Sequence, residues 1–251
     1  MKTAIIIGAT SGIGREVAVR LIEDGWKVGI AGRREERLQD LQGKYGSDRV
    51  RYAVMDVIRD DATQVLDALL EETGAPDLFL HVSGIGYQNP EIDEAIEVKT
   101  AQTNCVGMVR LVSHFVNYVK RSPAYDRKHK AHIGVVTSVA ATAGLGVAAC
   151  YSASKKMQVQ YLSALSQLAR MRDIPVFFSD IRPGFVATEL LERGHHYPIL
   201  MTADQAAGHI LKGLRRKRRV IIFDWRFRVI TALWYLIPRG LWERMTFIKT
   251  Q

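Results

Sequence analysis

The chain has 251 residues, of which 47% are hydrophobic and 24% are charged. This composition is that of a globular protein with a sizeable core and excludes disordered and fibrous chains, while the length leaves one or two domains open. The net charge of +9 comes entirely from residues 212–251, which contain 11 Lys or Arg and 2 Asp or Glu. The preceding body is neutral overall, so we expect no nucleic-acid partner for it.

The first residues and the two cysteines indicate the compartment. Only four consecutive apolar residues, Ala4 to Ile7, precede the first glycine, which is too few for the apolar core of a signal peptide. Cys105 and Cys150 cannot form a disulfide framework for a chain of this length, and neither belongs to a CxxC or Cys/His cluster. We therefore expect a reduced, cytoplasmic protein that is not exported.

From the N-terminus to residue 211, short β-branched runs alternate with amphipathic stretches. The runs are apolar on consecutive residues, which is typical of parallel strands covered by helices on both faces. We predict one α/β domain over residues 1–214, with a doubly wound, Rossmann-like parallel sheet, and a basic amphipathic extension over residues 215–251 packed on the same domain. The predicted strands are Ala4–Ile7, Lys27–Ala31, Val50–Met55, Leu78–Val82, Ile133–Thr137 and Val176–Ile181. The predicted helices are Gly14–Glu23, Arg34–Tyr45, Asp61–Glu72, Asn104–Val119 and Ala153–Arg172.

The first predicted strand runs directly into a glycine-rich turn and then into a helix. Such a turn lets backbone N–H groups and the helix N-terminus meet a pyrophosphate without interference from Cβ atoms. The spacing is G-x3-G-x-G, and a tight turn without any ligand is the alternative interpretation. The predicted cofactor-binding residues of the turn are Gly8, Ser11, Gly12, Ile13 and Gly14.

The end of the second predicted strand indicates which dinucleotide is bound. NAD-binding folds place an acidic residue there for the adenosine ribose, whereas arginine suits a 2′-phosphate. This chain has Gly32 in the acidic position, followed by Arg33 and Arg34. We therefore predict NADP(H). In the alternative interpretation both arginines only solvate the start of a helix, where positive charge is unfavourable.

A third group of residues has the pattern of a proton donor. Tyr151 and Lys155 are four residues apart on a predicted helix, so they share one face, and Ser138 follows a strand 13 residues before the tyrosine. A nearby ammonium stabilises a phenolate and lowers the tyrosine pKa, which is about 10 in model peptides. Such a tyrosine donates a proton to a carbonyl oxygen.

Over roughly residues 3–211 the chain resembles the short-chain dehydrogenase/reductase family. The glycines of the turn and the Ser138, Tyr151 and Lys155 set match the family's motifs in order. The chain departs from the family at Ile7, where a threonine is usual, and at His81-Val82-Ser83-Gly84, where Asn-Asn-Ala-Gly is usual. The resemblance adds Asn104 as a catalytic residue, and Asp56, Val57, Ser83, Gly84, Tyr151, Lys155, Pro183, Gly184, Val186 and Thr188 as cofactor-binding residues.

The resemblance implies NADPH-dependent reduction of a carbonyl to an alcohol, or the reverse, on a hydrophobic small molecule. Tyr151 would donate the proton, Ser138 would hydrogen-bond the same oxygen, and Lys155 would lower the Tyr151 pKa and bind the nicotinamide ribose. Asn104 would help to hold a water that relays protons to Lys155. A non-catalytic NADP(H)-binding protein of the same fold is the alternative. His81 as a second base is disfavoured, since a histidine at a strand end is more often structural.

Residues 189–201 occupy the place of the family's mobile lid, and the substrate is not predictable from them. His195 and His196 have no partner at a metal-ligand spacing, so we predict no metal site.

The C-terminal extension begins with the basic run 215–219 and continues with a strand-like stretch, Val220 to Phe223. Apolar residues then recur at steps of three and four from Val229 to Leu241, which predicts an amphipathic helix too short to span a bilayer. Three interpretations stay open: packing against a sister subunit, contact with an anionic membrane, and nucleic-acid binding, which is the least favoured. The same face would also serve as a wall of the substrate pocket. We expect a homo-oligomer, with peripheral contact at the inner face of a membrane as the second interpretation.

Overall fold

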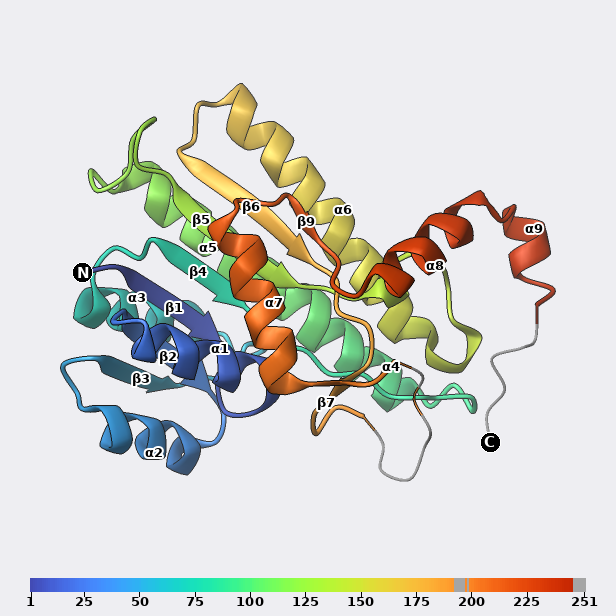
Figure 1. Cartoon of the computed structure of the whole chain (residues 1–251), viewed down its shortest axis with the longest axis horizontal. Helices are drawn as coiled ribbons and strands as arrows, with labels where there is room; N and C mark the ends of the chain where they lie inside the picture. Colours follow the sequence, from blue (N-terminus) through green and yellow to red (C-terminus); the bar gives the residue numbers. More distant parts are fainter. Residues whose placement is uncertain (192–196, 198, 246–251) are drawn as a thin grey trace.

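The computed structural model describes residues 1–191, 197 and 199–245. Seven parallel strands form one sheet in the order β3-β2-β1-β4-β5-β6-β9, and a separate pair, β7 and β8, lies outside it (Figure 1). The strands are β1 (Thr3–Ile7), β2 (Lys27–Gly32), β3 (Val50–Val54), β4 (Leu78–His81), β5 (Ala131–Val136), β6 (Val176–Ile181), β7 (Val186–Ala187), β8 (Met201–Thr202) and β9 (Val220–Ile221). The helices are α1 (Gly12–Glu23), α2 (Glu35–Tyr45), α3 (Ala62–Thr73), α4 (Glu94–Ala101), α5 (Met108–Arg121), α6 (Ala149–Met171), α7 (Ala203–Arg215), α8 (Trp225–Leu236) and α9 (Arg239–Trp242).

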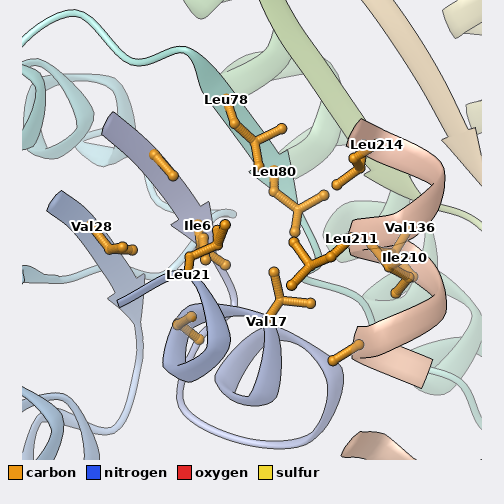
Figure 2. Close-up of a cluster of buried hydrophobic side chains, with 14 of the residues drawn as sticks. Ile6, Val17, Leu21, Val28, Leu78, Leu80, Val136, Ile210, Leu211 and Leu214 are labelled. Carbon is orange, nitrogen blue, oxygen red and sulfur yellow. The ribbon is translucent and has the colours of Figure 1, made fainter. Parts of the chain in front are cut away.

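The sheet is buried on both faces, which explains its uninterrupted apolar runs. Alternate residues of β1 enter two different cores, since Ile6 packs with α1, α2 and α7, and Ile5 packs with α3, α5 and α6. Figure 2 shows the first of these cores, with Val17 and Leu21 of α1 close to Leu211 of α7. The predicted doubly wound α/β fold is therefore confirmed.

The strand order reverses at β1, which pairs with β2 on one side and with β4 on the other. The turn after β1 and the turn after β4 consequently lie together, and the Ser83 amide donates to the Ile7 carbonyl at 3.0 Å. In parallel sheets the crevice at such a reversal, beyond the carboxyl ends of the strands, is where ligands bind.

The structure corrects two predicted elements. The helix predicted over Asn104–Val119 is instead the second half of a π-helical segment (Gln102–Gly107) followed by α5, and α4, which was not predicted, precedes them. The helix predicted from Val229 to Leu241 is interrupted at Pro238, because proline has no N–H to continue the ladder, so α8 ends at Leu236 and a short α9 follows. The strand-like stretch before it contains β9, which pairs with β6 as the seventh strand.

Candidate active site

The glycine turn after β1 brings backbone very close to backbone. A Cβ on Gly14 would lie 2.0 Å from the Gly8 carbonyl oxygen, and Gly8 itself has φ +95°. Helix α1 begins at Gly12, so its N-terminal N–H groups are at the crevice, and the Ser11 side chain makes no capping hydrogen bond to them. Predicted residues Gly8, Ser11, Gly12, Ile13 and Gly14 thus form a cradle that fits the pyrophosphate of a dinucleotide.

Arg34 lies against this turn. Its guanidinium donates to the Thr10 hydroxyl at 2.9 Å and to the Ser11 hydroxyl at 2.6 Å. Thr10 also explains Gly32, because a Cβ there would lie 2.5 Å from the Thr10 methyl group. The place that an acidic side chain takes in NAD-binding folds is therefore filled by Thr10.

A second arginine, Arg37, joins Arg34 on one carboxylate. Glu189 accepts from Arg34 at 2.5 Å and from Arg37 at 2.7 Å, and these hydrogen bonds lower the pKa of Glu189 to about 2. Arg33, which the sequence predicts as a partner of Arg34 on the 2′-phosphate, follows β2 with an exposed side chain, and its role stays a prediction. Arg37 was not predicted from the sequence, although its place one helical turn after Arg34 indicates that both arginines share a face. Beside this pair lies a cavity of about 310 Å³ lined by Thr10, Ser11, Gly12, Arg15, Arg37 and Asp40.

Six of the other predicted cofactor residues lie at the carboxyl ends of three strands. Asp56 and Val57 follow β3, Ser83 and Gly84 follow β4, and Pro183 and Gly184 follow β6. Val186 is in β7, and the Thr188 methyl group reaches the turn, since a Cβ on Gly12 would lie 2.9 Å from it. These residues thus all lie at the edge of the sheet where the strands end, beside the glycine turn.

The three residues predicted for proton transfer meet at the carboxyl end of β5. The Ser138 hydroxyl lies close enough to the Tyr151 phenol to lower its pKa, and it accepts from the Ala140 amide at 3.0 Å. Tyr151 and Lys155 lie on α6, with the Lys155 Nζ 5.7 Å from the centre of the tyrosine ring. The Nζ donates to the Val136 carbonyl at 3.1 Å.

Burial dominates the acid–base properties of this group. It raises the pKa of Tyr151, and only the Ser138 hydrogen bond opposes that rise. Burial thus outweighs the predicted lowering of the Tyr151 pKa by Lys155, whose ammonium is directed to the Val136 carbonyl. Burial also lowers the pKa of Lys155 to about 8, while the charges of Cys105 and Asp180 oppose that change.

Asn104 is fully buried in the π-helical segment, a local structure that is frequent at functional sites. Its side chain accepts from the Ile85 amide at 2.9 Å and donates to the Ile85 carbonyl at 2.8 Å and to the Ser154 hydroxyl at 3.0 Å. Its backbone carbonyl accepts from Gln158 at 2.7 Å. Asn104 therefore fixes the chain after β4 beside Lys155, and Gln158 is a partner that the sequence analysis misses.

His81 is buried at the end of β4, and in the described part of the chain its ring nitrogens make no hydrogen bond of good geometry. Burial, together with the charge of Lys155, lowers the pKa of His81 to about 3. Its imidazole is therefore neutral near pH 7. Within residues 1–191, 197 and 199–245 no cluster of three metal-ligating side chains occurs. His195 and His196 lie outside the described residues.

A buried ion pair that the sequence analysis misses connects the site to the extension. Arg182 donates to Asp180 at 2.6 and 2.7 Å, and Thr137 donates to the other carboxylate oxygen at 2.6 Å. Tyr235 of α8 lies close enough to Arg182 to help raise the pKa of its guanidinium. The end of β6, the environment of Lys155 and α8 are thus linked by one set of contacts.

Comparisons with known proteins identify relatives of this chain and proteins of the same fold. The family model described as short chain dehydrogenase matches residues 2–196. An oxidoreductase of Myxococcus xanthus is 30% identical over 248 residues, which cover 96% of this chain and 95% of the relative. A short chain dehydrogenase/reductase of Burkholderia phymatum in complex with NAD has a TM-score of 0.79 at 22% identity and covers 92% of each chain. An alcohol dehydrogenase of Thermococcus sibiricus complexed with 5-hydroxy-NADP has a TM-score of 0.74 at 22% identity, covering 89% of this chain and 95% of that one.

Proposed function

Since this chain belongs to the short-chain dehydrogenase family and is an oxidoreductase of that family, we propose that it uses NADPH to reduce the carbonyl group of a hydrophobic small molecule, or runs the same reaction in reverse. The observation that carries this proposal is the group formed by Ser138, Tyr151 and Lys155 at the crevice beside the glycine turn. A protein that only binds a dinucleotide has no need of these three groups in contact.

The residues have separate tasks in the reduction. When bound in the cradle of the glycine turn, NADPH would supply the hydride that the carbonyl carbon accepts. Tyr151 donates its phenolic proton to the carbonyl oxygen as negative charge develops there, and Ser138 donates a hydrogen bond to the same oxygen. Burial keeps Tyr151 protonated until that charge appears. The Lys155 ammonium then stabilises the phenolate, and Asn104 holds the adjoining chain in place.

The preference for NADPH rests on the two arginines at the turn. Arg34 and Arg37 already hold the carboxylate of Glu189, so their geometry suits an anion. A 2′-phosphate is such an anion, and each hydrogen bond to a charged group contributes about 1.5–3 kcal/mol. Gly32 offers no acceptor for the ribose hydroxyl of NADH.

Turnover measurements test the proposed reductase activity. NADPH oxidation is followed with a panel of ketones, quinones, steroids and acyl-chain carbonyls, with Tyr151→Phe as the control that keeps the fold and removes the proton donor. We expect turnover with an apolar carbonyl, its loss in Tyr151→Phe, and NADPH binding within a few-fold of wild type. Binding of NADPH without turnover of any carbonyl in the panel would favour the non-catalytic alternative.

Fluorescence titration of both cofactors tests the preference. Wild type should bind NADPH about ten- to a hundred-fold more tightly than NADH, and the Arg34→Ala/Arg37→Ala double variant should lose the difference. Arg127→Ala is the matched control, because Arg127 is an exposed arginine before β5, at the opposite edge of the sheet from the glycine turn. Loss of the preference in Arg33→Ala alone would show that the arginines are misassigned. The homo-oligomeric state and the cytoplasmic location stay predictions.

A further inference from the structure

Helix α8 exposes an apolar face to solvent. Four large apolar side chains on it are exposed by 48% to 78%: Trp225, Val229, Leu233 and Leu236. With about 100° per residue these four positions fall within about 80° of one another around the helix. The opposite side carries the buried Phe227 and Thr231, which face the body of the protein. The exposed face is therefore separate from the side by which α8 packs.

Two arginines border this face. Arg226 and Arg228 are both exposed, and the helical spacing places one on each side of the apolar residues. The acidic residues of α8 and α9 lie at their ends, where Asp224 pairs with Arg226 and Glu243 pairs with Arg239. Arg228 makes no ion pair in the described part of the chain, where its Nε donates to the Ile222 carbonyl at 2.9 Å. The border thus keeps a net positive charge.

We propose that this face docks α8 in the plane of an anionic lipid bilayer, with its apolar residues among the acyl chains and its arginines at the headgroups. Apolar residues bordered by cations are what an interfacial helix requires. Among the described residues no helix is long and apolar enough to cross a membrane, so docking is peripheral. A symmetric contact between two copies fits less well, because it brings the same arginines together while the nearby carboxylates are already paired.

The packed side of α8, opposite the docking face, lies next to the proposed active site. Phe227 packs on Phe185 with ring centres 6.2 Å apart, and the Lys156 ammonium lies 5.3 Å from the Tyr235 ring. The Trp242 indole of α9 donates to the Gly144 carbonyl at 2.7 Å, on the chain between Ser138 and Tyr151. In Figure 1, α8 and α9 (red) stand beside the ends of β6 and α6. A docked molecule would hold its crevice close to apolar compounds dissolved in the bilayer, an advantage that rests on the proposed function, whereas docking itself does not.

Vesicle sedimentation of the full chain tests the proposal. Wild type should bind vesicles of phosphatidylcholine with phosphatidylserine, and should bind pure phosphatidylcholine more weakly. Trp225→Ser and Leu236→Ser should each reduce binding about tenfold, because each removes a large apolar group from the bilayer. Met171→Ser is the matched control, since Met171 is 73% exposed, as Trp225 is 72%, but lies at the end of α6. Arg228→Gln should reduce binding to the anionic vesicles alone.

Titration with NADPH establishes that each variant is folded, and it does so independently of any turnover. Light scattering of the same samples tests whether the exposed face of α8 is instead a contact between subunits. If wild type ignores anionic vesicles at low salt, the proposal is wrong. If it forms an oligomer that Trp225→Ser and Leu236→Ser dissociate while Met171→Ser does not, the face is a subunit contact and the proposal is equally overturned.

Discussion

Glu189 occupies the anion site that we assign to the 2′-phosphate of NADPH. Its carboxylate is bound by Arg34 and Arg37, and the low pKa keeps it charged at any ordinary assay pH. An NADPH molecule that uses both arginines has to displace this carboxylate, whereas NADH does not. The side chain therefore opposes the binding of one cofactor more than that of the other.

We expect Glu189→Gln to tighten NADPH binding by about three- to tenfold, since exposed ion pairs contribute about 0.2–1 kcal/mol each, and to leave NADH binding nearly unchanged. Fluorescence titration of both cofactors measures the effect. Asp204→Asn is the control, because Asp204 is an exposed carboxylate paired with Arg20 at 2.6 Å, outside the crevice. Weaker NADPH binding in Glu189→Gln would mean that the carboxylate helps to hold the cofactor.

At the scale of single residues, the sequence predicts those site residues that belong to a local motif. The glycine turn and the Ser138, Tyr151 and Lys155 set have fixed spacings, so their meeting in the structure follows from them. The contact of Glu189 with Arg34 joins positions 155 residues apart and has no local pattern. The direction of the Tyr151 pKa shift was not predictable for another reason. The spacing indicates that Lys155 is near, but it does not reveal the burial, which raises the pKa by more than the ammonium lowers it.

The attachment of α8 to the body depends on Gly184. A Cβ there would lie 2.1 Å from the Phe227 ring, so the ring occupies the space that a side chain would need. Gly184 lies in the segment proposed to hold the nicotinamide. The position of α8 and the shape of that segment are consequently coupled through one close contact.

Gly184→Ala should lower the free energy of unfolding by about 1–3 kcal/mol, the usual cost of overpacking, as measured by urea denaturation. In a Phe227→Ala background the same substitution should cost much less, because the ring is absent. Gly43→Ala is the control, since Gly43 lies in α2 with no atom within 4 Å of the added carbon, and it should stabilise by up to about 1 kcal/mol. An equal cost of Gly184→Ala in both backgrounds would contradict the coupling.

Element boundaries were predictable where apolar runs are uninterrupted. The strand Val176–Ile181 has the predicted bounds, and the strands at Ala4, Lys27, Val50, Leu78 and Ile133 agree within two residues at each end. The helix at Asn104 was predicted as one element because periodicity cannot distinguish a π-helical segment from an α-helix. Glu94–Ala101 was missed because its apolar residues form no clear stripe.

For the whole molecule, the buried His81 and the partly buried His132 make stability depend on pH. Burial lowers the pKa of His81 to about 3 and that of His132 to about 4, from 6.5 in an unfolded chain. Between these values the unfolded chain binds protons that the folded chain does not. Stability is therefore complete above about pH 6.5 and falls as the pH decreases toward 4.

Each histidine should contribute a slope of about 1.4 kcal/mol per pH unit over this range. Urea unfolding at several pH values gives the slope for wild type and for His81→Asn, which places a non-titrating amide at the site. The variant should have the shallower slope, whatever its stability at neutral pH. Equal slopes would mean that His81 takes up its proton in the folded protein.

The whole fold was predictable because its α/β alternation is regular, and that prediction is confirmed. The pairing of the extension with the sheet was not predictable, because two β-branched residues do not indicate which strand they pair with. In the structure Val220 and Ile221 continue the hydrogen bonding of β6, with the Asp180 amide donating to the Arg219 carbonyl at 2.9 Å.

Because β9 is the last strand of the sheet, the basic run 215–219 lies at the edge of the sheet. A parallel sheet that ends on a long apolar edge can pair with another chain and aggregate. Here the last strand has only two residues, Val220 is exposed, and the exposed cations of residues 215–218 lie just before it. Short length and positive charge are the features by which natural sheets resist growth at an edge. Removing the extension would uncover β6 and leave a sheet able to recruit strands from neighbouring molecules.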